Sequence, residues 1–167
     1  MIDPKIAPLS GQIRASTAGD GNRVVSIWRD AVDATHHFLT VSDRLAIDVA
    51  VRDFLPSAPM MLWVDDHDVA VGFMILTEFR MEALFVDPSK HGMGIGRRFV
   101  EYALERHPTI TTEVNEQNHQ ARRFYDGVGF ETVGRSELDE EGRPYPLLHL
   151  QLRRSAYQPR SQPHRIV

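Results

Sequence analysis

The chain has 167 residues, 42% of them apolar, which fits one domain with a well-buried core. Its 19 basic and 23 acidic residues give a formal net charge of −4, which argues against a nucleic-acid-coating protein. The absence of cysteine excludes disulfides, thiolate nucleophiles and zinc–thiolate sites. The sequence shows neither an apolar leader nor the roughly 20 apolar residues of a membrane helix, so we expect a cytoplasmic protein without membrane or nucleic-acid partners.

The first part of the chain predicts a short strand followed by two helices. The strand is expected at residues 12–16, and residues 20–33 then space their apolar side chains at helical intervals. A second helix is expected to begin at a Ser42 cap and to end before Pro56. The apolar residues of this helix that we expect to point partly inward are Leu45, Ile47, Val49 and Phe54.

The rest of the chain predicts a hairpin and then an alternation of strands and helices. The expected elements are strands at 61–64, 69–76 and 81–86, a helix at 94–106, a strand at 109–114, a helix at 118–128 with Gly129 as its stop, and closing strands at 130–137 and 147–152. This order gives a mixed sheet and an α/β (α+β) fold class. We expect one domain over residues 1–153, and a disordered tail over residues 154–167 because that segment has little apolar content.

A glycine-rich loop between a strand and a helix carries the strongest chemical signal. It reads Lys90-His-Gly-Met-Gly-Ile-Gly-Arg-Arg98. Glycines let the backbone approach an anion, and the N–H groups of the first helical turn then point at it, which is typical of a phosphate site. The dinucleotide motif would need glycine at Arg97, and the P-loop motif is absent. The alternative is a turn chosen only for close packing of strand on helix.

The order of motifs around this loop resembles the GNAT superfamily of N-acetyltransferases. The residues that carry the resemblance are the strand 81–86, Asp87-Pro88, the loop 91–96, Val114, Asn118, Ala121, Phe124-Tyr125 and Gly129-Phe130. The resemblance implies a single-domain fold with a mixed sheet of six to seven strands, splayed at the acetyl-CoA site, and four helices. It also implies acetyl-CoA as co-substrate, with its pantetheine arm between strands 81–86 and 109–114 and its pyrophosphate on the glycine loop.

The resemblance assigns a set of residues to the coenzyme. They are Leu84, Phe85, Val86, His91, Gly92, Met93, Gly94, Ile95, Gly96, Arg97, Asn115, Asn118 and Tyr125. The superfamily loop usually begins with Arg or Gln where this chain has His91, so Arg97 or Arg98 is expected to supply the positive charge instead. Asn118 is also a good helix N-cap, and both roles are compatible.

Without cysteine, direct attack of an amine on the thioester is the economical mechanism. The resemblance implies Tyr125 as the acid that protonates the leaving thiolate; the alternative is an aromatic residue that only packs its helix. Glu82 interrupts an apolar strand and is a candidate base if burial raises its basicity. The competing interpretation is an exposed ion pair with Arg80. Glu113 is a second candidate base, and a base that acts through ordered water could make either carboxylate replaceable.

The acceptor is a small-molecule or protein amine that the sequence leaves unidentified. By resemblance, His36 and His37 lie in the acceptor wall, and Arg80 could recognise an acidic acceptor; a surface role is the alternative for all three. The scattered histidines predict no metal site. A non-catalytic acyl-CoA-binding module and a structural nucleotide-binding domain remain alternative functions, and the chain could be a monomer or a homodimer.

Overall fold

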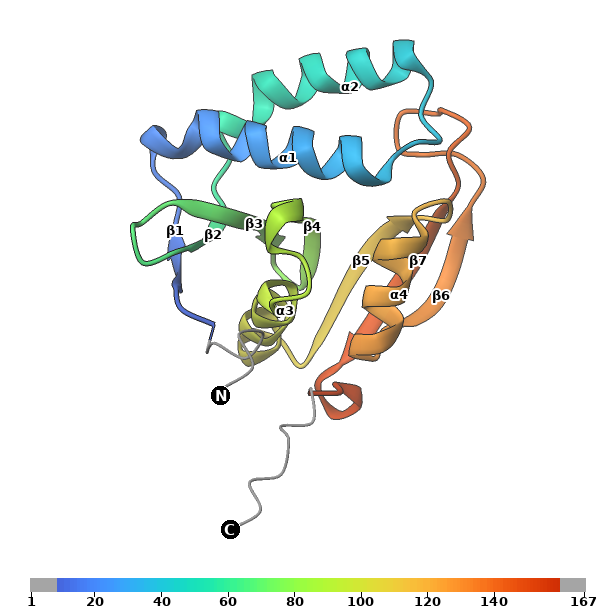
Figure 1. Ribbon diagram of the computed structural model, residues 1–167. Helices are drawn as coiled ribbons and strands as arrows, with labels where there is room; N and C mark the ends of the chain where they lie inside the picture. Colours follow the sequence, from blue (N-terminus) through green and yellow to red (C-terminus); the bar gives the residue numbers. More distant parts are fainter. Residues whose placement is uncertain (1–8, 160–167) are drawn as a thin grey trace, which may run out of the picture.

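Alternating apolar residues build a seven-stranded mixed sheet within residues 9–159, the part of the chain that the computed structural model describes (Figure 1). The strand order is β1-β2-β3-β4-β5-β7-β6. The strands are β1 (Gln12–Ala15), β2 (Met61–Val64), β3 (Ala70–Thr77), β4 (Arg80–Val86), β5 (Thr109–Asn115), β6 (Glu131–Ser136) and β7 (Leu147–Arg153). The α-helices of this part are α1 (Gly21–Thr35), α2 (Val41–Phe54), α3 (Ile95–Arg106) and α4 (His119–Val128). The predicted fold class is confirmed.

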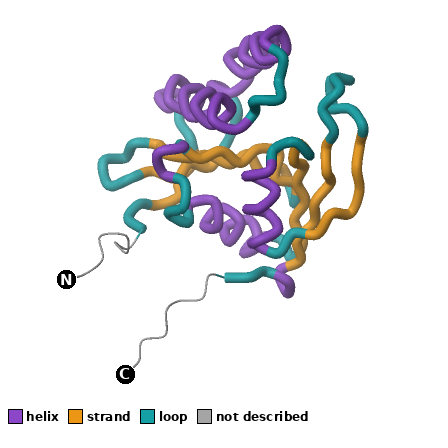
Figure 2. Tube along the Cα trace, turned by 45° about the vertical axis from the view of Figure 1, so that its right-hand side comes forward, coloured by secondary structure: helices purple, strands orange, loops and turns teal. Residues whose placement is uncertain are grey.

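Helices cover both faces of the sheet, and Figure 2 shows the first two helices on one side and the other two on the opposite side. One buried cluster joins α1 to β2 and β3 through Ile27, Leu62 and Phe73. The other joins α3 and α4 to β5 and β7, with Phe99 and Val128 fully buried. These apolar layers fix α1 on one face of the sheet and α3 and α4 on the other.

The parallel pair β4–β5 is joined over two positions only. Arg80 pairs with Thr111 and Met81 with Thr112, and beyond these residues the strands diverge. The two strands thus form a fork. The Thr112 hydroxyl donates to the Met81 carbonyl at 2.9 Å at the vertex of this fork, where the strands part. In the β3–β4 ladder the register shifts so that Glu82 has no facing partner, which is the geometry of a β-bulge. The sheet is therefore splayed, as the superfamily resemblance implied.

Helix α2 differs from its prediction in both its cap and its face. Thr40, and not Ser42, is the N-cap, since its hydroxyl accepts from the Asp43 amide at 3.2 Å. Leu45, Val49 and Phe54 are 62%, 50% and 59% exposed, so the expected inward orientation is wrong for these three. The reason is that α2 packs on the outside of α1 and not on the sheet (Figure 1).

The end of the described chain is ordered, so the predicted disordered tail is wrong for residues 154–159. Arg154–Ala156 forms a 3-10 turn, and the Gln158 amide donates to the Val128 carbonyl at 3.0 Å. Tyr157 packs against the core below α3, and its hydroxyl donates to Glu101 at 2.6 Å. One aromatic residue and several backbone hydrogen bonds thus anchor a segment of otherwise polar composition. Residues 160–167 of the predicted tail lie outside the described residues.

Gly129, which was expected to stop helix α4, does so with a left-handed backbone (φ 112°), and a Cβ there would lie 2.5 Å from the Ala156 carbonyl oxygen. Gly142 has a φ of 78° and open space around it. We expect Gly142→Ala to lower the free energy of unfolding by about 1–2 kcal/mol, the cost of a left-handed alanine. Gly129→Ala should cost roughly 1–3 kcal/mol more because the C-terminal turn must also move. Urea unfolding measures both, and equal losses would contradict the packing of this turn.

Candidate active site

The glycine loop has the backbone geometry of an anion site. Gly92 and Gly94 have φ values of 80° and 91°, and a Cβ on either would meet no atom within 4 Å, so the backbone borders open space. Gly94 is the N-cap of α3, whose first N–H groups have no acceptor within the helix. Gly96 has a different role: a Cβ there would lie 2.9 Å from the Phe124 ring, so this glycine lets α3 and α4 pack closely.

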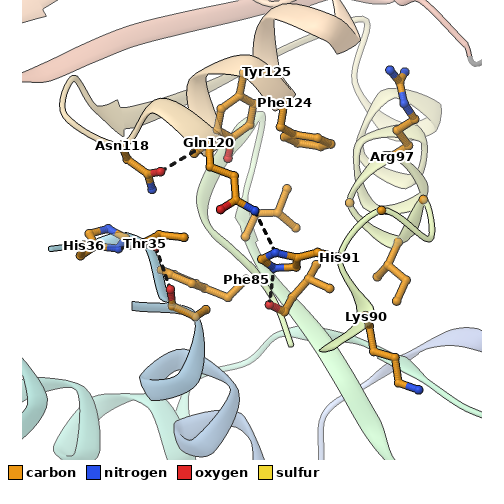
Figure 3. A pocket seen from close by; sticks show the side chains of 18 residues that line it. Thr35, His36, Phe85, Lys90, His91, Arg97, Asn118, Gln120, Phe124 and Tyr125 are labelled. Atoms are coloured by element: carbon orange, nitrogen blue, oxygen red, sulfur yellow. Dashed lines mark hydrogen bonds between the residues drawn. The ribbon is translucent and has the colours of Figure 1, made fainter. Parts of the chain in front are cut away.

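This loop borders a cavity of about 260 Å³ between α3 and α4 (Figure 3). The cavity also reaches β4 and the C-terminal end of α1. Its lining residues are Ala31, Thr35, His36, Leu84, Phe85, Val86, Lys90, His91, Gly92, Gly94, Ile95, Gly96, Arg97, Asn118, Gln120, Ala121, Phe124 and Tyr125. Of the predicted coenzyme residues, only Met93 and Asn115 are not among them; the Met93 side chain is half exposed. The site therefore assembles from four elements.

Tyr125 lies on α4 with its hydroxyl directed into the cavity (Figure 3). The residue is 6% exposed, and its ring makes edge contacts with Phe124 and Phe130 at centroid distances of 5.1 Å. Burial raises the pKa of Tyr125 to about 12, against a smaller opposing effect of a hydrogen bond with Thr112. The phenol thus keeps its proton at neutral pH, beside the threonine at the vertex of the fork.

The two candidate bases are the first residues beyond the fork, Glu82 on β4 and Glu113 on β5. Glu82 is exposed and accepts from Arg80 at 2.7 Å, so the structure shows the exposed ion pair, one of the two interpretations that the sequence left open. The same guanidinium lies 3.3 Å from Glu113 and 2.8 Å from Glu140. Neither candidate base is among the residues that line the cavity, and Arg80 is bound to carboxylates outside it.

His36 lies where the C-terminal end of α1 borders the cavity. Its Nδ1 is 2.8 Å from the Thr35 hydroxyl, which itself donates to the Ala31 carbonyl, so Nδ1–H is the donor in this pair. Burial lowers the pKa of His36 to about 4, with an opposing contribution from a hydrogen bond to Asn115. His37 is exposed, contacts the Ala34 carbonyl at 3.1 Å and does not line the cavity. Only the first of the two histidines therefore faces the site, as a neutral ring.

The His91 side chain points into the cavity (Figure 3). Its Nε2–H donates to the Val86 carbonyl, and its Nδ1 accepts from the Gln120 amide, both at 2.9 Å. Arg97 donates to the Gln158 and Gly127 carbonyls at 2.6 and 3.1 Å, and Arg98 pairs with Glu101. Other groups thus contact both guanidiniums in this structure, and a charge contact of either arginine with the phosphate stays a prediction.

The position of Asn118 is compatible with both roles expected of it, contact with the coenzyme and capping of the helix. It lines the cavity, and its Oδ1 caps α4 by accepting from the Ala121 amide at 3.1 Å. Sequence reasoning missed other lining residues: Ala31, Thr35, Lys90, Gln120, Ala121 and Phe124. Gln120 and Phe124 are four residues apart on the helix that carries Tyr125, a spacing that could have revealed them.

Residues 9–159 contain no helix long and apolar enough to cross a membrane. Within the same residues, no group of three or more His, Cys, Asp or Glu side chains is placed to hold a metal ion. The carboxylates beside the fork, Glu82 and Glu113, are paired with the Arg80 guanidinium.

The lowered pKa of His36 predicts a pH-dependent stability. Between pH 6.5, the ordinary pKa of the imidazole, and about pH 4, His36 is protonated in the unfolded chain but not in the folded chain. The free energy of unfolding therefore falls as the pH is lowered through this window. We expect His36→Gln to remove about 1–3 kcal/mol of that fall. Urea unfolding at pH 7 and pH 4.5 measures it, with His37→Gln as the control for an exposed imidazole. Equal pH dependence in wild type and His36→Gln would contradict the burial of this ring.

Comparison with known proteins agrees with the fold. A family model described as an acetyltransferase (GNAT) domain matches residues 35–146. The peptidyl-lysine N-acetyltransferase YjaB of Salmonella typhimurium is 51% identical over 138 residues, which cover 83% of this chain and 95% of the relative. The solution structure of apo-form YjaB from Escherichia coli matches with a TM-score of 0.83 at 49% identity, over 86% of this chain and 97% of that one.

A more distant structure shares the fold alone. The Salmonella typhimurium acetyltransferase yncA, solved with acetyl-CoA, has a TM-score of 0.57 at 18% identity over 94% of this chain and 99% of its own. The family match and the YjaB relatives confirm the resemblance that the glycine loop and Tyr125 indicated. This chain belongs to the GNAT family of acetyltransferases.

Proposed function

We propose that this protein transfers the acetyl group of acetyl-CoA directly to the side-chain amine of lysine residues in other proteins. The observation that carries the proposal is one cavity with an anion-binding loop at one end and the buried, protonated Tyr125 beside the strand fork. Acetyl-CoA is the acetyl donor, as in the family, and the lysine acceptor is the one named for YjaB. Residence in the cytoplasm stays a prediction.

The coenzyme's pyrophosphate lies on the first-turn N–H groups of α3, and its thioester reaches the fork between β4 and β5. The neutral lysine nitrogen attacks the thioester carbonyl carbon, so that a C–N bond forms and the C–S bond then breaks. Tyr125 gives its proton to the departing thiolate, and the surplus proton of the amine passes to a carboxylate. Tyr125 regains its proton from solvent, so the products are an acetylated lysine and free CoA.

Glu113 is the better of the two candidate bases, acting through a water molecule. It follows Thr112, the residue that touches both the fork vertex and Tyr125, and its side chain is 20% exposed. Glu82 is more open to solvent and is held by Arg80. The base and the acid then lie on opposite faces of the sheet, because side chains of neighbouring residues in a strand alternate.

In this proposal the rings of His36, Phe38 and Tyr145 form the acceptor wall, which suits the long apolar stem of lysine. The rings of His36 and Phe38 lie 5.3 Å apart, and those of Phe38 and Tyr145 lie 5.9 Å apart. The lowered pKa of His36 keeps this wall uncharged at neutral pH, so it does not repel an approaching amine. Arg80 serves the carboxylates of the fork in this proposal and not the acceptor.

Titration calorimetry and a turnover assay test this function in sequence. We expect acetyl-CoA and CoA to bind while ATP and NAD do not, and a lysine-containing peptide to release CoA thiol from acetyl-CoA. Coenzyme binding without thiol release on any lysine peptide or small amine would instead support a non-catalytic acyl-CoA-binding module. Preference for a nucleotide would overturn the coenzyme site.

Tyr125→Phe separates catalysis from binding. The substitution removes the proton donor but keeps the ring that packs against Phe124 and Phe130. We expect kcat to fall about 10²- to 10⁴-fold, the usual contribution of general acid catalysis. The Kd for CoA should stay within about threefold of wild type, because the loop backbone is unchanged. A weaker Kd with normal kcat would assign Tyr125 to binding.

A further inference from the structure

His149 links the candidate base to the neighbouring strands on the sheet face opposite α3 and α4. Its Nδ1 lies 2.9 Å from Glu113 Oε1, and its Nε2 lies 2.7 Å from the Ser136 hydroxyl. An ionised carboxylate only accepts hydrogen bonds, so Nδ1–H is the donor. The remaining lone pair on Nε2 then accepts from Ser136. One neutral tautomer of His149 therefore satisfies both contacts at once.

Strand β6 is shaped to receive this ring. The β6–β7 register shifts between Thr132 and Gly134, which leaves Val133 as an extra residue and sets Gly134 opposite His149. A Cβ on Gly134 would lie 3.1 Å from the imidazole Cδ2, closer than nearly all real contacts of this kind. The bulge and the missing side chain together make room for an imidazole in this position.

The charged groups around His149 come from three strands. Glu113 on β5 is its acidic partner, and the second oxygen of that carboxylate lies 3.3 Å from Arg80 on β4. On β6, Arg135 is held by Glu116 and Glu137, and Ser136 is the group that contacts the ring. With the imidazole on one oxygen and the guanidinium on the other, the Glu113 carboxylate is fixed in orientation beside the fork.

We propose that His149 is a positioning residue that orients the Glu113 carboxylate for proton abstraction; Ser136 holds the ring in place. The inference rests on the proposed function, in which Glu113 is the base. Loss of the His149 donor leaves one carboxylate oxygen without the partner that fixes its orientation, so kcat falls.

The test compares four variants with wild type in the acetyl-CoA and lysine-peptide assay. His149→Leu removes the donor, His149→Asn keeps an N–H group near the position of Nδ1, and Ser136→Ala releases the ring. Gln151→Ala is the matched control, two residues further along the same face of β7. We expect His149→Leu to lower kcat about 10- to 100-fold, with an unchanged KM for acetyl-CoA. His149→Asn should recover most of the loss, Ser136→Ala should lie between, and Gln151→Ala should match wild type.

Two outcomes would overturn the inference. One is a kcat of His149→Leu equal to that of Gln151→Ala. The other is no recovery of kcat in His149→Asn when all variants unfold at the same urea concentration. If wild type acetylates no lysine peptide, the proposed function fails separately. The contact between His149 and Glu113 is then tested by following the carbon-13 signal of the Glu113 carboxyl during a pH titration of the coenzyme-free protein. A response that His149→Leu changes and Gln151→Ala does not would support the link; an unchanged response would reject it.

Discussion

The short pairing of β4 with β5 is the constraint on which the site depends. Two residue pairs hold these parallel strands together, and the Thr112 hydroxyl bond to Met81 closes the point where they part. The extra residue at Glu82 interrupts the neighbouring ladder at the same level. Because the strands separate here, backbone groups that a continuous sheet would use for its own hydrogen bonds become available to a ligand.

Polar contacts hold the outer helix α2 against the rest of the fold. Asp48 on α2 is 9% exposed and lies within 3.3 Å of three guanidiniums, those of Arg29, Arg44 and Arg52. The hydrogen bond from Arg29 is the main reason that the pKa of Asp48 lies well below its usual range, although burial opposes it. Tyr145 joins the other end of this helix to the loop before β7, since its hydroxyl donates to Asp43 and accepts from the Thr40 amide.

The sequence predicted most of the fold because the strands and three helices bury one face against the sheet, which produces a regular apolar pattern. The outer helix could not be predicted in the same way. Asp48 is its buried residue, and the apolar side chains Leu45 and Val49 face outward, so its pattern points in the wrong direction.

The glycine loop and Tyr125 could be recognised because their chemistry is local. The partners of Arg97 are 30 and 61 residues away, and those of Glu113 lie on β4 and β7, so only the folded chain reveals them. His149 gave no signal for the same reason: its relation to Glu113 depends on the register of β5 with β7.

The bridge from His91 to Val86 and Gln120 ties the end of β4 to α4 across the cavity (Figure 3). A coenzyme arm that runs along β4 meets an imidazole already bonded to the Val86 carbonyl. Docking of this arm therefore exchanges hydrogen bonds more than it adds them, and the net gain in affinity along this stretch is small. In the proposed function, the pyrophosphate on the loop would then supply the larger share of the binding energy, so the coenzyme would be held chiefly by its nucleotide end.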